Sequence, residues 1–300
     1  MTVSLAVITC VYNGEAFVGE YWIGIKKLGD LVSEIVIVND GSTDATREKL
    51  GELSDGRLKV IHQANLGLPA SRNVGLGMTS SDYVIFLDID DCLNEFGLRR
   101  IKSLLEKEDH DVVVANVKYV GDDNAGLRRL NWLRKFALPK RGNISRKIFF
   151  NNFLVTPSCL VIKSSYAKRH KFRPELTIGE DWEFFTRVLD TTSLTVKNYP
   201  LVHYLIVEGS MSSTALKDRT KVRLLMKYLA ENYINSNGPQ ASLYARHVEV
   251  MISLFELKRA NYPLALAELI PVHWGLILKS PRSIGYVVIS LFRFALFKVI

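Results

Sequence analysis

Short apolar runs alternate with amphipathic stretches over the first 120 residues of the chain. Each run is rich in β-branched residues and stops at a polar turn, which predicts buried strands. The predicted strands are Ser4–Thr9, Glu34–Val38, Leu58–His62, Tyr83–Leu87 and Asp111–Tyr119. Helical spacing between them predicts helices over Ala16–Leu28, Asp44–Leu53 and Ala70–Met78. Buried strands that alternate with helices are typical of an α/β fold with a mostly parallel sheet and helices on both faces.

The pattern changes after Leu216, where the apolar strand-like runs stop. Helical spacing and intervening prolines predict helices over Lys221–Tyr233, Leu243–Arg259 and Tyr262–Ile270. We therefore expect two parts, an α/β domain over residues 1–215 and a helical C-terminal extension over residues 216–300.

The composition is that of a globular protein, since 48% of the 300 residues are hydrophobic and 23% are charged. It excludes a disordered chain. The three cysteines are widely spaced, which excludes a disulfide scaffold and favours a reducing compartment. No secretory signal opens the sequence, so we expect a cytoplasmic protein.

Positive charge is concentrated in two places. The net charge is +8, residues 215–300 hold 12 basic and 5 acidic side chains, and Asn124–Lys147 holds eight basic and no acidic ones. Such patches are either solvated surface or sites for phosphate-bearing partners, such as nucleotides and lipid head groups. No nucleic-acid-binding module accompanies the charge, so nucleic acid is not an expected partner.

The last stretch, Ser283–Ile300, is strongly apolar and includes Arg293 and Lys298. Its longest uncharged run has ten residues, too few to span a membrane. Two interpretations stay open. The stretch is a helix that lies in an anionic membrane surface, which would make the protein peripheral on the inner face of the cytoplasmic membrane. Alternatively, it packs on the domain or pairs two copies into a homodimer.

Three carboxylates follow the fourth predicted strand within four residues, in the sequence FLDIDD. Carboxylates this close repel one another and lose hydration. A helix N-cap needs one aspartate, which would explain Asp91 but not Asp88 and Asp90. Hard divalent cations such as Mg²⁺ and Mn²⁺ take carboxylate oxygens and commonly share their coordination sphere with substrate phosphates. The motif therefore predicts a metal site.

Polar residues also follow the first two predicted strands, in TCVYNGE (Thr9–Glu15) and VIVNDGSTDAT (Val36–Thr46). Taken alone, each segment is better explained as a strand–turn–helix junction than as a binding site. Because the two turns lie parallel, one nucleotide could touch both. An aspartate at such a strand end, here Asp40, can accept hydrogen bonds from a base or ribose.

Two further segments contain candidate polar groups. NLGLPASRNVGL (Asn65–Leu76) contains Arg72, whose planar fork suits phosphate or carboxylate oxygens, although a surface arginine explains it equally well. GEDWEFFTRVL (Gly179–Leu189) opens an amphipathic helix with Glu180 and Asp181. These acids either complement the helix dipole or supply a general base.

Other chemistries lack their motifs. The sequence contains no G-x-G-x-x-G and no G-x-x-x-x-G-K-[ST], so dinucleotide and P-loop phosphate sites are not expected. It has no histidine–cysteine set with zinc spacing and no G-x-S-x-G elbow.

Taken in order, these five segments resemble the successive motifs of the family 2 inverting glycosyltransferases. The resemblance runs from Met1 to about Ser213. It implies the Rossmann-like A-type glycosyltransferase fold, which belongs to the nucleotide-diphospho-sugar transferase superfamily. No Q-x-x-R-W follows, the element of the family's processive synthases, which favours transfer of one sugar per encounter.

The resemblance also assigns roles to single residues. It places Thr9, Tyr12 and Glu15 in the wall of the nucleotide pocket, Asp40 at the nucleobase with Ser42 beside it, and Arg72 and Asn73 near the diphosphate. Asp88 and Asp90 match the family's D-x-D, with Asp88 toward the ribose or metal and Asp90 as metal ligand. Asp181 matches the proposed catalytic base, with Glu180 as its neighbour.

We therefore expect a metal-dependent enzyme, with Mn²⁺ or Mg²⁺, that moves one sugar from a nucleotide-sugar donor to an acceptor. The donor is expected to be a UDP-sugar, and the acceptor a glycan or a polyprenyl-lipid-linked sugar of the cell surface. A non-catalytic nucleotide-sugar-binding scaffold is the alternative. It would be expected to lose one of the acidic pairs, whereas Asp88/Asp90 and Glu180/Asp181 are both present.

Overall fold

The computed structural model describes residues 2–121 and 154–205, together with residues 138, 144, 148, 221, 224, 225, 227–229, 231 and 232. The chain divides into two compact units, Met1–Pro239 and Gln240–Ile300, and the described residues all belong to the first. The predicted helices Leu243–Arg259 and Tyr262–Ile270 and the apolar stretch Ser283–Ile300 lie outside the described residues, as does nearly all of Asn124–Lys147.

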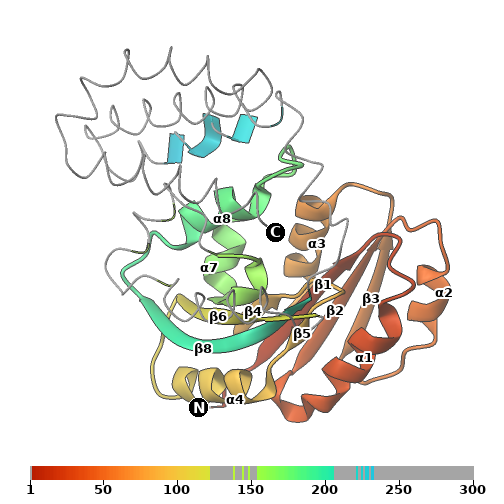
Figure 1. Cartoon of the computed structure of the whole chain (residues 1–300), viewed down its shortest axis with the longest axis horizontal. Helices are drawn as coiled ribbons and strands as arrows, with labels where there is room; N and C mark the ends of the chain where they lie inside the picture. Colours follow the sequence, from red (N-terminus) through yellow and green to blue (C-terminus); the bar gives the residue numbers. More distant parts are fainter. Residues whose placement is uncertain are drawn as a thin grey trace. The chain divides into compact units, whose positions relative to one another are not determined.

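The described residues form a mixed sheet of eight strands in the order β3-β2-β1-β4-β7-β6-β8-β5 (Figure 1). Its first half is parallel and consists of β1 (Leu5–Val11), β2 (Glu34–Asp40), β3 (Leu58–Gln63) and β4 (Tyr83–Phe86). The second half consists of β5 (Cys92–Leu93), β6 (Val112–Val120), β7 (Leu160–Lys163) and β8 (Leu194–Leu205). The strand β7 runs antiparallel to both β4 and β6, whereas β6 and β8 are parallel.

Helices cover both faces of this sheet, as predicted (Figure 1). On one side lie α1 (Val18–Lys27), α2 (Thr46–Gly51) and α4 (Glu95–Leu105), with the 3₁₀ turn η1 (Gly29–Leu31) between α1 and β2. On the other side lie α3 (Leu68–Met78), α7 (Ser164–Arg169) and α8 (Glu180–Val188). A second 3₁₀ turn, η2 (Pro157–Cys159), leads into β7.

The five predicted strands and the three predicted helices of the first 120 residues are confirmed, and no boundary differs from its prediction by more than two residues. Three strands were not predicted. The strand β5 has two residues, β7 has four, and β8 mixes polar and apolar positions and includes Pro200. These strands gain stability from their neighbours in the sheet, and their own sequences carry little strand signal.

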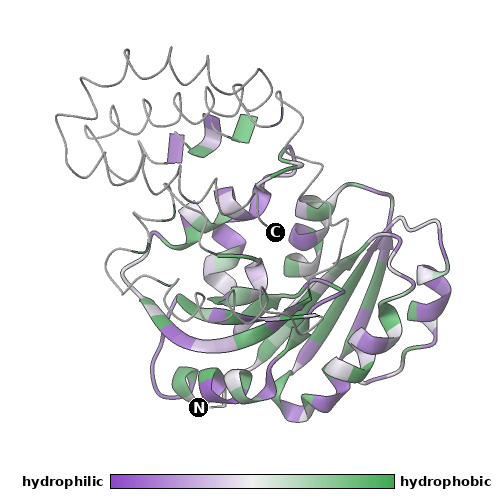
Figure 2. Cartoon of the chain, viewed as in Figure 1, coloured by the Kyte–Doolittle hydropathy of each residue, from purple (hydrophilic) through white to green (hydrophobic). Residues whose placement is uncertain are grey.

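The core consists of the central strands and an aromatic cluster on the α8 side. The apolar positions of β1, β2, β4 and β6 are almost fully buried, and Figure 2 shows these strands as predominantly hydrophobic. The ring of Phe86 packs edge-on against Phe172 and Phe184, whose own rings are stacked 3.9 Å apart. This cluster joins the end of β4 to α8.

The chain order reverses next to β1, because β2 and β3 lie on one side of it and β4 on the other. In open α/β sheets, ligands bind beyond the carboxyl ends of the strands at such a reversal. The residues that follow β1, β2 and β4 therefore meet at one edge of the sheet. This edge carries three of the five predicted motifs.

No helix within the described residues is long and apolar enough to cross a membrane.

The opposite end of the sheet is held by the carboxylate of Glu34, at the start of β2. Its oxygens accept hydrogen bonds from the Ser81 amide (2.9 Å) and hydroxyl (2.7 Å) and from Lys59 Nζ (2.7 Å). The Thr79 hydroxyl donates a further bond. Although burial alone would raise the pKa of Glu34, these hydrogen bonds lower it well below its ordinary value. The carboxylate thus fixes the turn that feeds β4.

We predict that Glu34→Gln destabilises the protein by about 2 kcal/mol at pH 7, because charge-assisted hydrogen bonds are lost and an amide faces backbone donors. Urea unfolding of the variant measures this, with the exposed Glu52→Gln as control. Because the folded-state pKa of Glu34 is lowered, the wild-type advantage should be full above the unfolded pKa of about 4.3 and shrink as the pH falls below it. An advantage that is independent of pH would contradict this account.

Candidate functional site

The carboxylates after β4 form one half of the candidate site. Asp88 accepts a hydrogen bond from Arg72 Nη2 at 3.0 Å on one oxygen and from the Thr156 hydroxyl at 3.2 Å on the other. Asp91 is buried, and one of its oxygens accepts a bond from the Leu205 amide at 3.3 Å. Its other oxygen, Oδ2, is buried and has no hydrogen-bond partner among the described residues.

Burial and neighbouring carboxylates raise the pKa values of Asp90 and Asp91. Loss of hydration and the charge of Asp88 raise the pKa of Asp90. Burial, together with the charges of Asp88 and Asp90, raises the pKa of Asp91 to about 8. The described surroundings thus stabilise the charged forms of these two carboxyl groups poorly.

The second half of the site is the start of α8, where Glu180 and Asp181 occupy the first turn. The helix follows Gly179, whose φ of +64° is a left-handed conformation that favours glycine. Carboxylates in a first turn are stabilised by the helix dipole. The sequence therefore places both acids where the helix itself favours negative charge.

One guanidinium joins the two halves. Arg72, on α3, is almost fully buried, and its Nη1 lies 2.5 Å from Asp181 Oδ1 and 3.5 Å from Glu180 Oε1, while Nη2 contacts Asp88. Its guanidinium also lies over the ring of Phe172, 5.1 Å from the centroid. Four predicted site residues from three distant motifs thus form one cluster.

The cluster shifts the pKa values of its members. Burial alone would lower the pKa of Arg72, but the carboxylates of Asp181, Asp88 and Glu180 raise it, so the guanidinium is charged. Burial raises the pKa of Asp181; Arg72 opposes this shift, and the charges of Glu180 and Asp88 add to it. Asp181 is therefore more basic than an ordinary aspartate.

Hydrogen bonds join the turns after β1 and β2 to one another. Asn13, at a φ of +52°, donates from its backbone amide to the Ser42 hydroxyl at 3.0 Å and accepts from the Thr43 amide at 2.8 Å. The Glu15 carboxylate accepts a bond from the Ala45 amide at 2.8 Å. Tyr12 between them is half-exposed. Ser42, Glu15 and Tyr12 therefore lie in one double turn at the edge of the sheet.

Asp40, at the end of β2, is buried and its carboxylate holds the loop before α3. It accepts hydrogen bonds from the amides of Leu66 and Gly67, both at 2.8 Å, and from Gln63 Nε2 at 2.7 Å. Its predicted contact with a nucleobase stays a prediction. In this structure the side chain organises the neighbouring loop.

Two predicted site residues have structural partners. Thr9 is fully buried, and its hydroxyl lies 2.7 Å from that of Tyr21. Asn73 pairs with the backbone of Phe172, donating to its oxygen at 2.8 Å and accepting from its amide at 2.9 Å. The hydrogen bonds of both residues thus go to other protein groups. Their predicted contacts with the substrate stay predictions.

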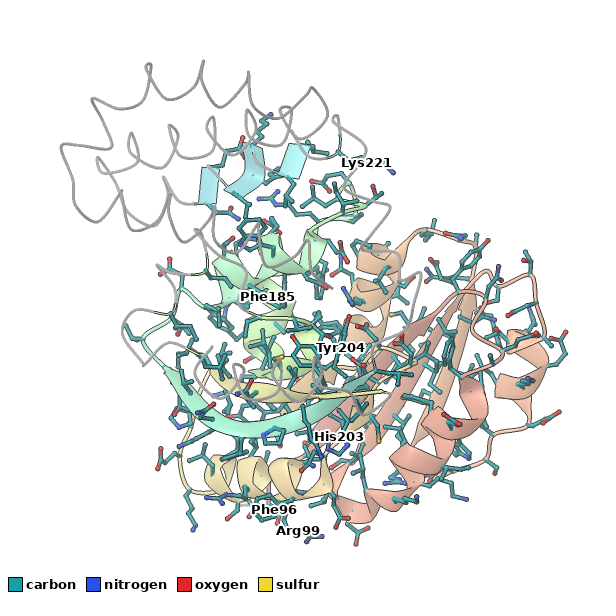
Figure 3. All side chains as sticks on the ribbon, in the orientation of Figure 1. Phe96, Arg99, Phe185, His203, Tyr204 and Lys221 are labelled. Carbon is teal, nitrogen blue, oxygen red and sulfur yellow. The ribbon has the colours of Figure 1, made fainter. Side chains whose placement is uncertain are left out.

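Sequence reasoning missed two groups near the carboxylates. Thr156 reaches Asp88, but a threonine in the segment before η2 carries no distinguishing signal. Tyr204 lies on β8 next to His203 (Figure 3), and burial with the charges of Asp91, Asp88 and Asp90 raises its pKa to about 12. His203 Nε2 lies 3.0 Å from Asn94 Nδ2, in a pairing away from the acids. A prediction of β8 would have been needed to find Tyr204.

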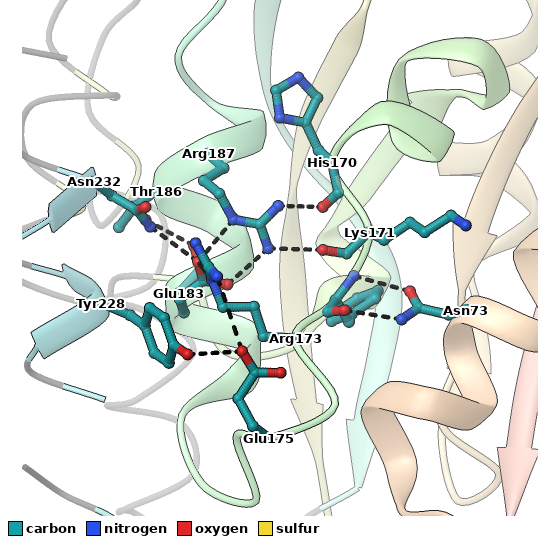
Figure 4. A network of polar contacts seen from close by, with 11 residues as sticks. Asn73, His170, Lys171, Arg173, Glu175, Glu183, Thr186, Arg187, Tyr228 and Asn232 are labelled. Carbon is teal, nitrogen blue, oxygen red and sulfur yellow. Dashed lines mark hydrogen bonds and ion pairs between the residues drawn. The ribbon is translucent and has the colours of Figure 1, made fainter. Parts of the chain in front are cut away.

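A second charged network lies on α8, one turn beyond the acids (Figure 4). The fully buried carboxylate of Glu183 accepts hydrogen bonds from Arg173 Nε at 2.8 Å and from Arg187 Nε and Nη2, both at 2.7 Å. Burial alone would raise the pKa of Glu183, but the arginines and Asn232 lower it. Glu183 is thus a fully paired structural acid, unlike Asp181 two residues earlier.

The arrangement offers two chemical capacities. The acids after β4 have unused acceptor capacity of the kind that hard cations or polar substrates satisfy. Asp181 is a partly buried carboxylate of raised basicity at the same edge of the sheet, suited to proton transfer. Arg72 contacts an acid of each kind, Asp88 after β4 and Asp181 on α8.

Comparison with known proteins identifies the chain's relatives. The sequence profile of the family described as Glycosyl transferase family 2 matches residues 6–170, more than half of the chain. An uncharacterized glycosyltransferase of Haemophilus influenzae is 29% identical over 249 residues, which cover 78% of this chain and 75% of that protein. Several other curated glycosyltransferases match over only about a third of their own length.

Two further relatives have names or structures that mention substrates. The Escherichia coli UDP-Glc:alpha-D-GlcNAc-diphosphoundecaprenol beta-1,3-glucosyltransferase WfgD is 23% identical over 219 residues, 71% of this chain and 81% of that protein. The chain in the crystal structure of S. aureus TarS 1–349 in complex with UDP-GlcNAc has 21% sequence identity to this chain. It has a TM-score of 0.64 and covers 84% of this chain and 71% of that one.

The fold likeness confirms the A-type glycosyltransferase architecture expected from the sequence. The profile match covers β1 to β7, and with them the strand ends that carry Asp40, Asp88 and Asp90. The chain therefore belongs to glycosyltransferase family 2 and is a glycosyltransferase.

Proposed function

We propose that this glycosyltransferase is an inverting, metal-dependent enzyme that transfers a single sugar. Its donor is a nucleotide-diphospho-sugar with UDP as the nucleotide, and its acceptor is a glycan or lipid-linked sugar in cell-surface polysaccharide biosynthesis. The observation that carries the proposal is that the buried guanidinium of Arg72 joins two acidic pairs. It contacts Asp88 of the pair Asp88/Asp90 and both members of the pair Glu180/Asp181. Retention of both pairs disfavours a non-catalytic scaffold.

The residues after β4 fit a divalent cation, Mg²⁺ or Mn²⁺, with Asp88 and Asp90 as its ligands. The buried Oδ2 of Asp91 lacks a partner within the described residues, a sign of uncompensated acceptor capacity. The described residues contain no group of three or more acidic, histidine or cysteine side chains arranged around one point. Two carboxylates are enough for Mg²⁺, which proteins commonly bind through one or two carboxylates together with substrate phosphates. When bound, it stabilises the charge of the nucleoside diphosphate leaving group.

Asp181 would act as the general base. The acceptor hydroxyl has a pKa far above 7, so its proton must be removed as the oxygen attacks the anomeric carbon. The raised pKa of Asp181 improves it as a base, and Arg72 orients its carboxylate. The new C–O bond forms as the bond to the diphosphate breaks, and the leaving group takes the electron pair. A base opposite the leaving group makes this an in-line displacement, which inverts the anomeric configuration.

The choice of substrates rests on two relatives. WfgD is named for UDP-glucose and a diphosphoundecaprenol acceptor, and TarS was solved with UDP-GlcNAc. These names support a UDP-sugar donor and a lipid-linked acceptor. A lipid-linked acceptor lies in a membrane. The basic stretch Asn124–Lys147 and the apolar stretch Ser283–Ile300 would then contact the anionic surface of that membrane. Pairing of two chains through Ser283–Ile300 remains the competing proposal.

We predict that a UDP-sugar raises the melting temperature in the presence of Mn²⁺ and not in EDTA. Ligands that bind only the folded state stabilise it by RT ln(1 + [L]/Kd), so micromolar binding is visible. The measurement is a thermal-shift panel of UDP, GDP, dTDP and CDP and their common sugars, each with Mn²⁺ and with EDTA. A metal-dependent shift with another base would correct the nucleotide, and no shift with any donor would contradict the proposal.

We predict that Asp181→Asn lowers the rate of sugar transfer by about 10²–10⁴-fold, the usual contribution of a general base. Binding of UDP with Mn²⁺ should stay within about threefold of wild type, because the base faces the acceptor. Asp190→Asn, the same change at an exposed position beyond the end of α8, is the matched control and should leave both properties unchanged. Normal turnover by Asp181→Asn would remove Asp181 as the base.

We predict that Asp90→Asn weakens Mn²⁺-dependent binding of UDP at least about tenfold, because a carboxylate ligand is lost. Isothermal titration with UDP and Mn²⁺ measures the effect, and Asp30→Asn, at an exposed position in η1, is the control. Unchanged affinity in Asp90→Asn would show that the cation binds elsewhere.

A further inference from the structure

The turn that presents Glu180 and Asp181 is covered by a residue from the segment after β8. Gly179 precedes α8, and a Cβ built on it would lie 2.3 Å from Leu225 Cδ2. Leu225 is itself buried. Because no side chain fits between them, Leu225 packs directly on the backbone of this turn.

The same segment reaches the middle of α8 through Asn232. Its side-chain Nδ2 donates to Glu183 Oε1 at 3.0 Å and to the Thr186 hydroxyl at 2.9 Å, and the residue is buried (Figure 4). Glu183 already has the charges of Arg173 and Arg187 beside it. The neutral amide of Asn232 adds one hydrogen bond to a carboxylate that two arginines already compensate, and it ties its own segment to the middle of α8.

A third contact lies between these two. The Tyr228 hydroxyl donates to Glu175 Oε1 at 2.8 Å, and Arg173 lies over the Tyr228 ring at 4.1 Å. Positions 225, 228 and 232 are helical and spaced by three and four residues, so they share one helix face. This face, which we call the bracing face, contacts the loop before α8, the turn that opens it and its buried middle.

We propose that the bracing face positions the base of the transfer reaction, with Leu225 and Asn232 as its positioning residues. This inference rests on the proposed function in one respect, the role of Asp181 as base. The helix α8 has nine residues, and Arg72 holds its first turn from the α3 side. Leu225 and Asn232 hold the same helix at Gly179 and at Glu183.

The physical reason is geometric. A base must lie within hydrogen-bond reach of the proton that it removes, and a displacement of about 1 Å can cost about 10²-fold in rate. Loss of the bracing face would let α8 shift or fray, while the carboxylates of Asp88 and Asp90 after β4 stay in place. Chemistry would then suffer more than binding of the nucleotide.

Hydrogen–deuterium exchange of the full chain tests the contact directly. We expect Asn232→Leu, which removes both hydrogen bonds at similar volume, to speed exchange of the amides of residues 183–188 about tenfold or more. The amides of β2 should keep wild-type protection. Lys227→Ala is the matched control, because Lys227 lies on the same segment, is exposed, and pairs only with the neighbouring Glu231 among the described residues.

Kinetics on the same variants test the positioning role. With UDP-glucose and UDP-GlcNAc as probes, we expect kcat for release of UDP to fall at least tenfold in Asn232→Leu. Binding of UDP with Mn²⁺ should stay within twofold. If Asn232→Leu loses protection everywhere, Leu225→Val replaces it as the test, because it removes only one methylene from the contact over Gly179. We expect Leu225→Val to lower kcat by a smaller factor and to leave the binding of UDP unchanged.

The outcomes separate this inference from the proposed function. Unchanged exchange of α8 in both variants would overturn the bracing role. Faster exchange with unchanged kcat would also overturn it, because the contact would then serve stability alone. If the wild-type chain consumes no nucleotide sugar, the proposed function fails; positioning of Asp181 as a base fails with it, while the exchange data still report whether the segment holds α8.

Discussion

A single buried cation, Arg72, holds the two acidic halves of the site at one place. Its guanidinium contacts Asp88 after β4 and Asp181 at the start of α8, and it rests on the ring of Phe172. A buried charge is costly unless it is paired and hydrogen-bonded, so Arg72 and the acids require one another. Removing either partner would leave a charge inside the protein without compensation. This contact therefore holds β4 and α8 together, beside the packing of Phe86 on Phe172 and Phe184.

Neighbouring acids on α8 have opposite environments. Glu183 has two arginines and an amide around it, which lower its pKa, whereas burial and nearby carboxylates raise the pKa of Asp181 despite Arg72. Groups whose surroundings separate their pKa values in this way commonly divide structural and chemical roles. Two positions on one helix thus carry a fully paired carboxylate and a carboxylate of raised basicity.

The sequence predicted the parallel half of the sheet because its strands are buried on both faces and read as continuous apolar runs. It did not predict β8, whose half-buried positions and Pro200 resemble a loop. The acids of the site were recognisable, since carboxylates that cluster after a buried strand need a physical reason. Their shared partner was not, because nothing local to Arg72 distinguishes a surface arginine from one that bridges residues 16 and 109 positions away. The contacts of Asn232 with Glu183 are equally non-local.

The double turn formed by Asn13 and Ser42 has a consequence for the thermodynamics of recognition. Its backbone amides are already hydrogen-bonded across the two loops, and the left-handed conformation of Asn13 is held by its bonds to Ser42 and Thr43. The loss of conformational entropy at this edge of the sheet therefore accompanies folding and not ligand capture. A molecule that binds against these turns contacts a preorganised surface. Its binding free energy therefore depends on contacts and desolvation, and the ordering of the protein costs little.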